Sequence, residues 1–450
     1  MKLGWRIFFI GLASSVFLGI FFAPIPGMDI AARCTLAVFA LALILWVSEA
    51  IPLYITSLVI AALLSIFVPP HLPSLAGGYK AFLAPFFSPV ILLFLGGFVL
   101  ARGLESYDLD SVLASAILRR VGKKPAAILA GFMGVTALLS MWMSNTAATA
   151  LMIAVALPLV RSIDEKDPMK IGLLIGIPFS ANLGGMATPI GTPPNAIAIT
   201  ALRDAGVKMN FLEWMGLALP VAIILLVLTW ILILILFRPR TPELTFSLQK
   251  VKKLSWKEWV VLGTLLATVA GWLTGRLHKI PDAIVALLPA VVFFSLGLLG
   301  RKDFRSLGWD VLILMGGGLA LGKAVAASGL DKWLITSLGM EGLPPIALFI
   351  GFILITVVLT NFISNTSSAA LIVPLAMGFA AESNSLVAGV ALAASASMLL
   401  PVSTPPNAIA FGSGLLKVKH MFRAGIIVAV IAVGVIFLFG LVIWPHLGIM

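Results

Sequence analysis

The chain has 450 residues, of which 61% are hydrophobic and 11% charged, and its mean hydropathy is +1.14. This composition excludes a soluble globular protein and indicates a polytopic membrane protein. The formal charge of +12 does not indicate a nucleic-acid partner, because the basic residues lie in short loops and form no basic face with interleaved aromatic residues. A single cysteine, Cys34, excludes an internal disulfide and a multi-cysteine metal site.

The N-terminus carries Lys2 and Arg6 before an apolar run over residues 7–22. Signal peptides and first membrane helices share this pattern. Prolines end the run where a small-residue cleavage site would be needed, so the pattern favours a helix at 6–23. We therefore expect residues 1–30 to form an extra N-terminal transmembrane helix.

A first repeat is predicted over residues 31–237. Apolar runs of about 20 residues, long enough to cross a bilayer, predict helices at 33–48, 53–68, 86–104 and 214–237. The apolar region 125–160 holds Ser144-Asn145-Thr146 at its centre, which predicts a re-entrant hairpin with this motif at its tip. Residues 171–203 predict a helix that is broken near Pro193-Pro194, because proline removes a backbone donor and clashes with the preceding turn.

A segment rich in proline and lysine, 238–257, predicts a cytoplasmic linker to a second repeat over 258–450. This repeat follows the same plan, with a hairpin at 345–380, a broken helix at 385–416 and helices at 258–275, 281–299, 310–328 and 423–443. The expected fold is therefore an all-α polytopic membrane protein with about eleven transmembrane helices and two re-entrant hairpins.

Three motifs occur twice in the same order. The hairpin motif is Ser140-Met-Trp-Met-Ser-Asn-Thr146 in the first half and Thr360-Asn-Phe-Ile-Ser-Asn-Thr366 in the second. The sequence Thr-Pro-Pro-Asn-Ala-Ile-Ala begins at both Thr192 and Thr404. Glycine pairs also precede the hairpins, at Gly96-Gly97 and within Gly316–Gly318. Repeated signals in one order indicate a duplicated chain.

The charge distribution predicts the orientation. If the N-terminus is cytoplasmic, eight of the 30 lysines and arginines fall outside, which fits the positive-inside rule: Arg33, Lys80, Arg203, Lys208, Arg276, Lys279, Lys323 and Lys332. Because each repeat has an odd number of predicted spans, five, the second copy should have the opposite orientation in the membrane to the first. Inverted repeats with paired broken helices are typical of secondary transporters, so we expect a multi-pass protein of the inner (plasma) membrane.

The centres of the predicted hairpins and broken helices contain neutral oxygens and no Asp or Glu. Hydroxyls, amides and freed carbonyls suit sodium, a hard cation, and the ends of broken helices attract anions. Sodium ions held by neutral ligands keep their charge, so two of them would attract a dianion. A proton relay is not supported, because Glu49, Lys323 and the four histidines lie near predicted span ends.

Structural alternatives apply to several of these residues. Serine, threonine and asparagine also join helices inside membranes, and we expect the paired glycines to allow close helix approach. For Asn195 and Asn407 two roles stay open, as caps of the second half-helices or as ligands.

With these motifs the chain resembles the divalent anion:sodium symporter (DASS) family of di- and tricarboxylate transporters over nearly its whole length. The resemblance implies a homodimer with a scaffold domain and a transport domain that moves like an elevator. It implies about two sodium sites, formed by Ser140, Ser144, Asn145 and the carbonyl of Gly191, and by Thr360, Ser364, Asn365 and the carbonyl of Ser403. The implied substrate-binding residues are Asn145, Thr146, Asn365 and Thr366, near Thr192 and Thr404. Ser403 departs from the family pattern, because the resemblance implies a smaller residue at this position.

The expected function is secondary active transport, with sodium-coupled symport of C4 dicarboxylates such as succinate, malate or fumarate. A sodium-independent dicarboxylate exchanger and a citrate or sulfate carrier remain alternatives within the same family. An anion channel is a more distant alternative. We do not expect an enzyme, because the sequence has no His-Glu-x-x-His, no Gly-x-Ser-x-Gly and no paired membrane carboxylates.

Overall fold

The computed structural model describes residues 3–244, 253–340, 342–379 and 384–446. Over these ranges the chain is helical and contains no β-strand. Eight of the described helices are long and apolar enough to cross a membrane. The count of eleven spans and the inversion of the two repeats stay predictions.

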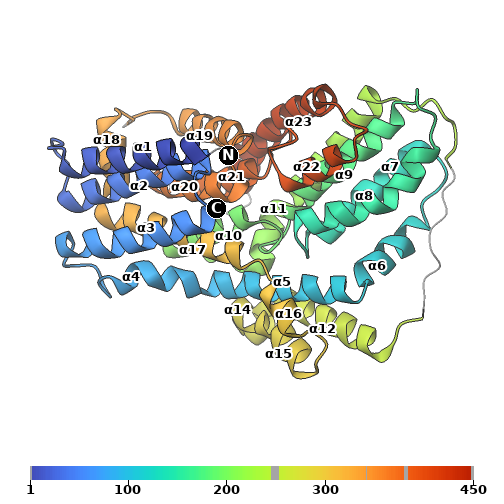
Figure 1. Cartoon of the computed structure of the whole chain (residues 1–450), viewed down its shortest axis with the longest axis horizontal. Coiled ribbons are helices and arrows are strands. Elements are labelled where there is room, and N and C mark those ends of the chain that lie inside the picture. The colour runs from blue at the N-terminus through green and yellow to red at the C-terminus, as the bar shows by residue number, and fades with distance from the viewer. Residues whose placement is uncertain (1–2, 245–252, 341, 380–383, 447–450) are drawn as a thin grey trace.

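The first half contains the helices coloured blue to green in Figure 1: α1 (Leu3–Phe22), α2 (Ile30–Ser48), α3 (Leu53–Phe67), α4 (Lys80–Leu83), α5 (Pro89–Ser106), α6 (Leu109–Leu118), α7 (Pro125–Ser140), α8 (Asn145–Ser162), α9 (Met169–Gly185), α10 (Pro193–Asp204) and α11 (Phe211–Leu236). Three of them start with proline, whose fixed φ suits the first helical position and whose missing N–H is not needed there.

The second half contains the helices coloured yellow to red: α12 (Trp256–Leu273), α13 (Gly275–His278), α14 (Asp282–Val285), α15 (Leu287–Ser295), α16 (Arg301–Arg305), α17 (Trp309–Ser328), α18 (Leu330–Ser337), α19 (Pro345–Thr360), α20 (Asn365–Met377), α21 (Asn384–Ala394), α22 (Pro405–Gly412), α23 (Val418–Leu438) and α24 (Trp444–His446), with a π turn at Phe439–Ile443. The hairpins are thus α7–α8 and α19–α20, and the broken helices are α9–α10 and α21–α22.

The structure differs from the expected helices at three places. The helix expected at 281–299 is interrupted at Ala286 and ends at Ser295. Pro289 explains the interruption, because it cannot donate to the carbonyl four residues before and its ring crowds that carbonyl. Gly297 explains the end, because its φ of +65° turns the chain out of the helix. Helices α6 and α18 were not expected.

The predicted linker 238–257 lies partly outside the described residues. In its N-terminal part, the N–H of Leu244 donates to the carbonyl of Lys123 over 2.9 Å. At its C-terminal end, Ser255 and Glu258 form a reciprocal capping box at the start of α12.

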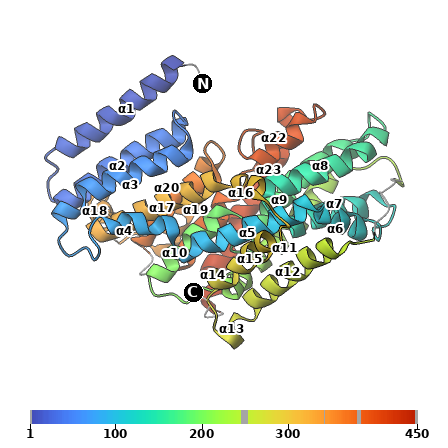
Figure 2. The same ribbon diagram turned by 60° about the horizontal axis from the view of Figure 1, so that its bottom comes forward.

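The two halves are interleaved around their broken helices. Helix α22 of the second half packs against α8 and α9 of the first, and α10 of the first half packs against α20 and α21 of the second. Figures 1 and 2 show the first hairpin, α7–α8, at the end of the molecule opposite to α1–α3, and the second hairpin, α19–α20, nearer to α1–α3. The second part of each broken helix, α10 or α22, therefore lies against the hairpin of the other half.

Glycines allow two of the close helix contacts, as expected. A Cβ at Gly96 would lie 2.1 Å from the carbonyl oxygen of Ala286, and one at Gly317 would lie 2.3 Å from the Cβ of Ser57. Both distances are far below van der Waals contact, so these positions admit only glycine without a shift of the packed helix.

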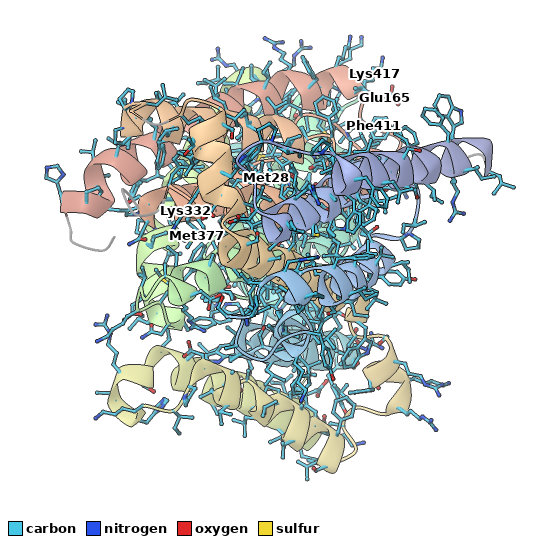
Figure 3. All side chains as sticks on the ribbon, turned by 90° about the vertical axis from the view of Figure 1, so that its left-hand side faces the viewer. Met28, Glu165, Lys332, Met377, Phe411 and Lys417 are labelled. Carbon is cyan, nitrogen blue, oxygen red and sulfur yellow. The ribbon has the colours of Figure 1, made fainter. Side chains whose placement is uncertain are left out.

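The outside of the molecule is apolar over most of its helices, as expected for contact with lipid. Large exposed side chains include Phe22 on α1, Ile235 on α11 and Val430 on α23. Figure 3 shows such side chains projecting outward from the helices, with Glu165 and Lys417 at the same edge of the view. These two residues belong to segments that were both predicted to be cytoplasmic.

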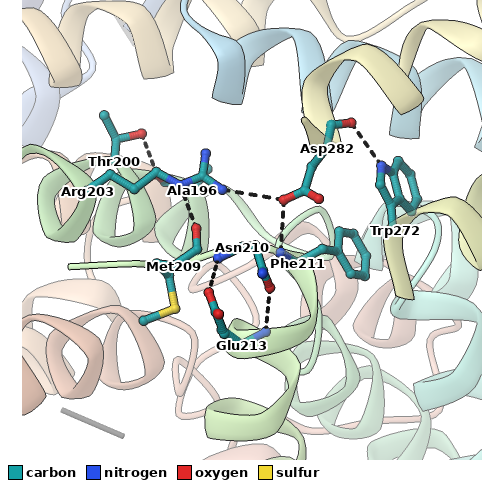
Figure 4. Close-up of polar contacts among 9 residues, drawn as sticks. All are labelled: Ala196, Thr200, Arg203, Met209, Asn210, Phe211, Glu213, Trp272 and Asp282. Atoms are coloured by element: carbon teal, nitrogen blue, oxygen red, sulfur yellow. Dashed lines mark hydrogen bonds and ion pairs between the residues drawn. The ribbon is translucent and has the colours of Figure 1, made fainter. Parts of the chain in front are cut away.

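Asp282 joins the start of α14 to the connection between α10 and α11 (Figure 4). Its carboxylate oxygen Oδ2 accepts from the N–H of Phe211 over 2.9 Å and lies 3.4 Å from Nη2 of Arg203. The indole N–H of Trp272 on α12 donates to the carbonyl of Asp282, and its ring stacks on Phe211 with centroids 4.6 Å apart. The Phe211 ring also stacks on Trp142 in the first hairpin turn. This network connects the first hairpin with α12 and α14.

Candidate functional site

Each hairpin turns in four residues, between Ser140 and Asn145 and between Thr360 and Asn365. The serine before each second helix caps it: Oγ of Ser144 accepts from the N–H of Ala147 over 3.2 Å, and the Ser364 hydroxyl accepts from the backbone N–H three residues on over 3.1 Å. The caps satisfy amide groups that the first helical turn leaves unpaired. The Ser-Asn-Thr motif therefore places a helix N-terminus at each tip.

Three neutral oxygens converge at the first tip. Oγ of Ser140, which is fully buried, lies 2.6 Å from Oδ1 of Asn145 and 2.8 Å from the carbonyl oxygen of Ala181 on α9. A hydroxyl has one proton, so it can donate to only one of these two acceptors at a time. With Oδ1 of Asn145 facing Ser140, one of the two close oxygen pairs has no proton between its members, an arrangement that a bound cation would relieve.

The second tip repeats this arrangement with one more hydroxyl. The Thr360 hydroxyl contacts Oδ1 of Asn365 over 2.9 Å and also the carbonyl oxygen of Ala394. Oγ of Ser397 lies 2.7 Å from the same Oδ1. These hydroxyls supply two protons for three oxygen contacts, so this cluster also lacks one proton.

These oxygen sets fit a sodium ion, since hard cations prefer neutral and anionic oxygens. The structure brings Ser140 and Asn145 together at one tip and Thr360 and Asn365 at the other. A Cβ at Gly191 would lie 2.4 Å from the carbonyl oxygen of Gly185, so the first break folds back onto the end of α9 beside that tip. The Ser144 and Ser364 hydroxyls lie in the same turns as caps.

Side chains from the breaks are tied to the hairpin turns. Thr188 donates through its hydroxyl to the carbonyl of Met141 over 2.6 Å. In the second half, Oγ of Ser403 makes the corresponding connection, to the carbonyl of Asn361 over 3.0 Å. The Ser403 side chain, the departure noted in the sequence, therefore anchors the second break to its hairpin.

Asn195 and Asn407 hold the two ends of each break together. The Asn195 amide nitrogen lies 3.0 Å from the carbonyl of Gly185 and 2.7 Å from that of Thr188, and the Asn407 amide lies 3.0 Å from the carbonyl of Leu400. Both asparagines are fully buried, and Oδ1 of each has no hydrogen-bond partner within the described ranges. These contacts satisfy carbonyls that the proline breaks leave free, which differs from the capping role considered for them.

A cavity of about 820 Å³ lies between the two tips. Its lining includes every residue that the sequence suggests for substrate binding, namely Asn145, Thr146, Thr192, Asn365, Thr366 and Thr404, together with Gly191, Ser144, Ser364 and Ser403. Ser140 and Thr360 lie deeper and are fully buried. The charged residues in the described lining are Glu49 and Asp310. An anion in this cavity would therefore depend on bound cations and helix N-termini for positive potential.

Several site residues were missed in the sequence. The carbonyls of Ala181 and Ala394 were missed because backbone groups carry no sequence signal. Ser397 was detectable, because it stands ten residues before Asn407 and could have been compared with the residue ten before Asn195. Asn182, which also lines the cavity, was missed because a single amide in an apolar helix is not distinctive.

The sodium:sulfate symporter transmembrane-region family matches residues 5–450. An uncharacterized transporter of Haemophilus influenzae is 37% identical over 444 residues, which cover 92% of each chain. A protein named sodium-dependent dicarboxylate transporter SdcS, from Staphylococcus saprophyticus, is 33% identical and covers 89% of this chain and 85% of its own. The protein of the same name from Staphylococcus aureus strain USA300 is 32% identical over 87% of this chain and 82% of its own.

Two solved structures share the fold at low sequence identity. The YdaH transporter of Alcanivorax borkumensis has a TM-score of 0.56 at 15% identity and covers 88% of this chain and 99% of its own. MtrF of Neisseria gonorrhoeae has a TM-score of 0.55 at 12% identity, over 96% and 98%. With the family match over almost the whole chain, the conclusion is that this protein belongs to the sodium:sulfate symporter (DASS) family of membrane transporters and is not an enzyme.

Proposed function

We propose that this transporter is a sodium-coupled symporter of C4 dicarboxylates such as succinate, malate and fumarate. The observation that carries the proposal is the pair of oxygen clusters, each short of one proton, beside a cavity whose described lining has no basic residue. The names of the staphylococcal relatives support both the sodium and the dicarboxylate.

The chemistry of the cavity explains the coupling. Two sodium ions, one at the Ser140–Asn145 cluster and one at the Thr360–Asn365 cluster, would bring two positive charges to a site built from neutral groups. A dianion bound between them balances these charges, and each species is unfavourable there without the other. Binding of sodium and of dicarboxylate is therefore reciprocal, so that each raises the affinity of the other.

The substrate would be received by the hairpin tips. Asn145, Thr146, Asn365 and Thr366 line the cavity at the N-termini of α8 and α20, where free amide groups and helix dipoles favour carboxylates. Thr192 and Thr404 line it at the starts of α10 and α22. Four helix N-termini thus border one cavity.

For the transport step we propose an elevator movement, in which the hairpins and broken helices carry the site past a scaffold in a homodimer. The predicted inversion of the two repeats supports alternating access of this kind. We place the protein in the inner (plasma) membrane with its N-terminus in the cytoplasm, on the basis of the positive-inside distribution.

Uptake of labelled succinate into proteoliposomes tests this function. Accumulation with an inward sodium gradient, and none with potassium or choline, is expected. Uptake that ignores sodium but requires dicarboxylate inside the vesicles would instead identify an exchanger. Competition by citrate and sulfate, measured in the same vesicles, would show whether the C4 dicarboxylates are preferred.

A further inference from the structure

The two tips differ at one matched position of the broken helices. Ten residues before the paired asparagines of the breaks stand Gly185 and Ser397. A Cβ at Gly185 would lie 2.5 Å from Oδ1 of Asn145, so the first tip leaves no room for a side chain there. At the second tip, Ser397 places its hydroxyl 2.7 Å from Oδ1 of Asn365. The second oxygen cluster therefore contains a hydroxyl that the first cannot have.

The lengths of the breaks explain how the second tip accommodates this side chain. Helix α9 continues through Gly185, and its break spans residues 186–192. Helix α21 ends at Ala394, and its break spans residues 395–404. Ser397 thus lies in non-helical backbone. Gly185, in contrast, belongs to α9, and its position in the helix holds it against Asn145 of the first hairpin.

The chemistry of Ser397 suits a ligand. Its side chain is fully buried, and its hydroxyl proton is used in the contact with Asn365. A hydroxyl keeps lone pairs for other interactions when it donates. Its contact with Asn365 joins it to the Thr360 cluster, which is short of one proton.

We propose that Oγ of Ser397 is an additional ligand of the second sodium site, so that the two sodium sites are unequal and the second binds sodium more tightly. This inference rests on the proposed sodium-coupled function. It predicts that sodium binds in two phases of different affinity, and that loss of Ser397 weakens the tighter phase.

Sodium-dependent thermal stabilisation of the purified protein tests the proposal without transport, since a ligand of the folded state raises Tm with its concentration. Sodium chloride is titrated against choline chloride at constant ionic strength, without substrate. For Ser397→Ala we expect the half-saturating sodium concentration of the tighter phase to rise about tenfold, as when supporting groups of metal sites are lost. Tm in sodium-free buffer should stay close to that of the wild type.

Ser395→Ala is the matched control. Ser395 is also fully buried, but its hydroxyl contacts the carbonyl of Ala391 in the last turn of the preceding helix, α21, so sodium titration should be unchanged. Should Ser397→Ala fail to give monodisperse protein, Ser397→Cys preserves the size and replaces oxygen with a poor ligand for a hard cation. The same rise in half-saturating sodium is expected for it.

The outcomes separate this inference from the proposed function. A wild type that sodium stabilises, with an unchanged titration in the Ser397 variants, overturns the inference alone. A lower sodium-free Tm with unchanged half-saturation also overturns it, because Ser397 would then only position Asn365. If sodium does not stabilise the wild type, the proposed function and the inference both fall.

Discussion

Asn182 and Thr404 lie 222 positions apart in the chain, yet the amide nitrogen of Asn182 is 3.4 Å from the hydroxyl oxygen of Thr404. Asn182 comes from the first broken helix, and Thr404 starts the second half of the other one. Both line the cavity, and Asn182 is fully buried with Oδ1 unpaired over the described chain. The two broken helices are thus directly connected at the candidate site.

Replacement of Asn182 by alanine is expected to weaken succinate binding, because the contact between the two broken helices is lost. The loss of one hydrogen bond, about 1 kcal/mol, corresponds to a rise in the KM of uptake of roughly fivefold. Ser180→Ala is the control, since its hydroxyl contacts carbonyls of its own helix. A KM equal to that of the wild type in Asn182→Ala would refute this role.

Replacement of Asn145 or Asn365 by alanine should abolish sodium-dependent uptake. Oδ1 of Asn145 lies against the Ser140 hydroxyl, and Oδ1 of Asn365 lies against the hydroxyls of Thr360 and Ser397. Each change therefore removes a proposed sodium ligand and a proposed substrate contact. Uptake measured in vesicles, with size-exclusion chromatography to check folding, tests both variants. Full transport by both would contradict the site assignment.

Gly185→Ala should impair sodium binding, although it adds only a methyl group. That Cβ would lie 2.5 Å from Oδ1 of Asn145 and displace it from the first cluster. Gly134→Ala is a matched control, because Gly134 lies in α7 of the same hairpin and a Cβ added there would meet no neighbouring heavy atom of the described residues within 4 Å. Sodium-dependent Tm shifts that are equal in the two variants would contradict the predicted clash.

The contacts of Asp282 predict a measurable coupling with Arg203. Asp282→Ala removes the acceptor for Phe211 N–H and the partner of the guanidinium, which should cost about 1–3 kcal/mol. A double-mutant cycle with Arg203→Ala, measured by thermal unfolding in detergent, should give less destabilisation than the sum of the single changes. Additive effects would show that the ion pair contributes nothing to stability.

Asp167 predicts a loss of stability in acid. Burial of this loop carboxylate raises its pKa, but hydrogen bonds from the backbone N–H of Met169 and from the hydroxyl and N–H of Thr241 and the N–H of Arg240 outweigh that cause, so the pKa is lowered overall. A carboxyl whose pKa falls on folding contributes stability above its unfolded value, near about 4, and loses it as pH falls through the folded value.

Asp167→Asn provides the comparison for this effect. The variant should have a lower Tm than the wild type at pH 7, and the difference should shrink as the pH falls below about 4. Tm measured against pH for both proteins tests this. A difference that stays constant down to about pH 3 would contradict it.

Much of the fold could be predicted from the sequence because strong local signals coincide. Apolar length locates the long helices, and the polar motif within residues 125–160 predicts a turn that the structure places between Ser140 and Asn145. Pro193 and Pro405 both begin the helix after a break. The interruption at Ala286 was missed, because a single proline in an apolar run was outweighed by hydropathy.

The candidate site was only partly predictable. Residues in repeated motifs, such as Asn145 and Asn365, could be paired by inspection. The carbonyl of Ala181, the Asn182–Thr404 contact and the packing of α22 on α8 depend on how the two halves interleave, which no local pattern encodes. The proton shortage at the tips likewise becomes visible only when distances are known.

The most direct measurement for this account is succinate binding by calorimetry, with purified protein in sodium chloride and in choline chloride at equal ionic strength. The account predicts strong binding in sodium and at least about tenfold weaker binding in choline, with sodium affinity raised by succinate by the same factor. Equal succinate affinity in both salts would contradict a site in which bound cations supply the positive charge for the dianion.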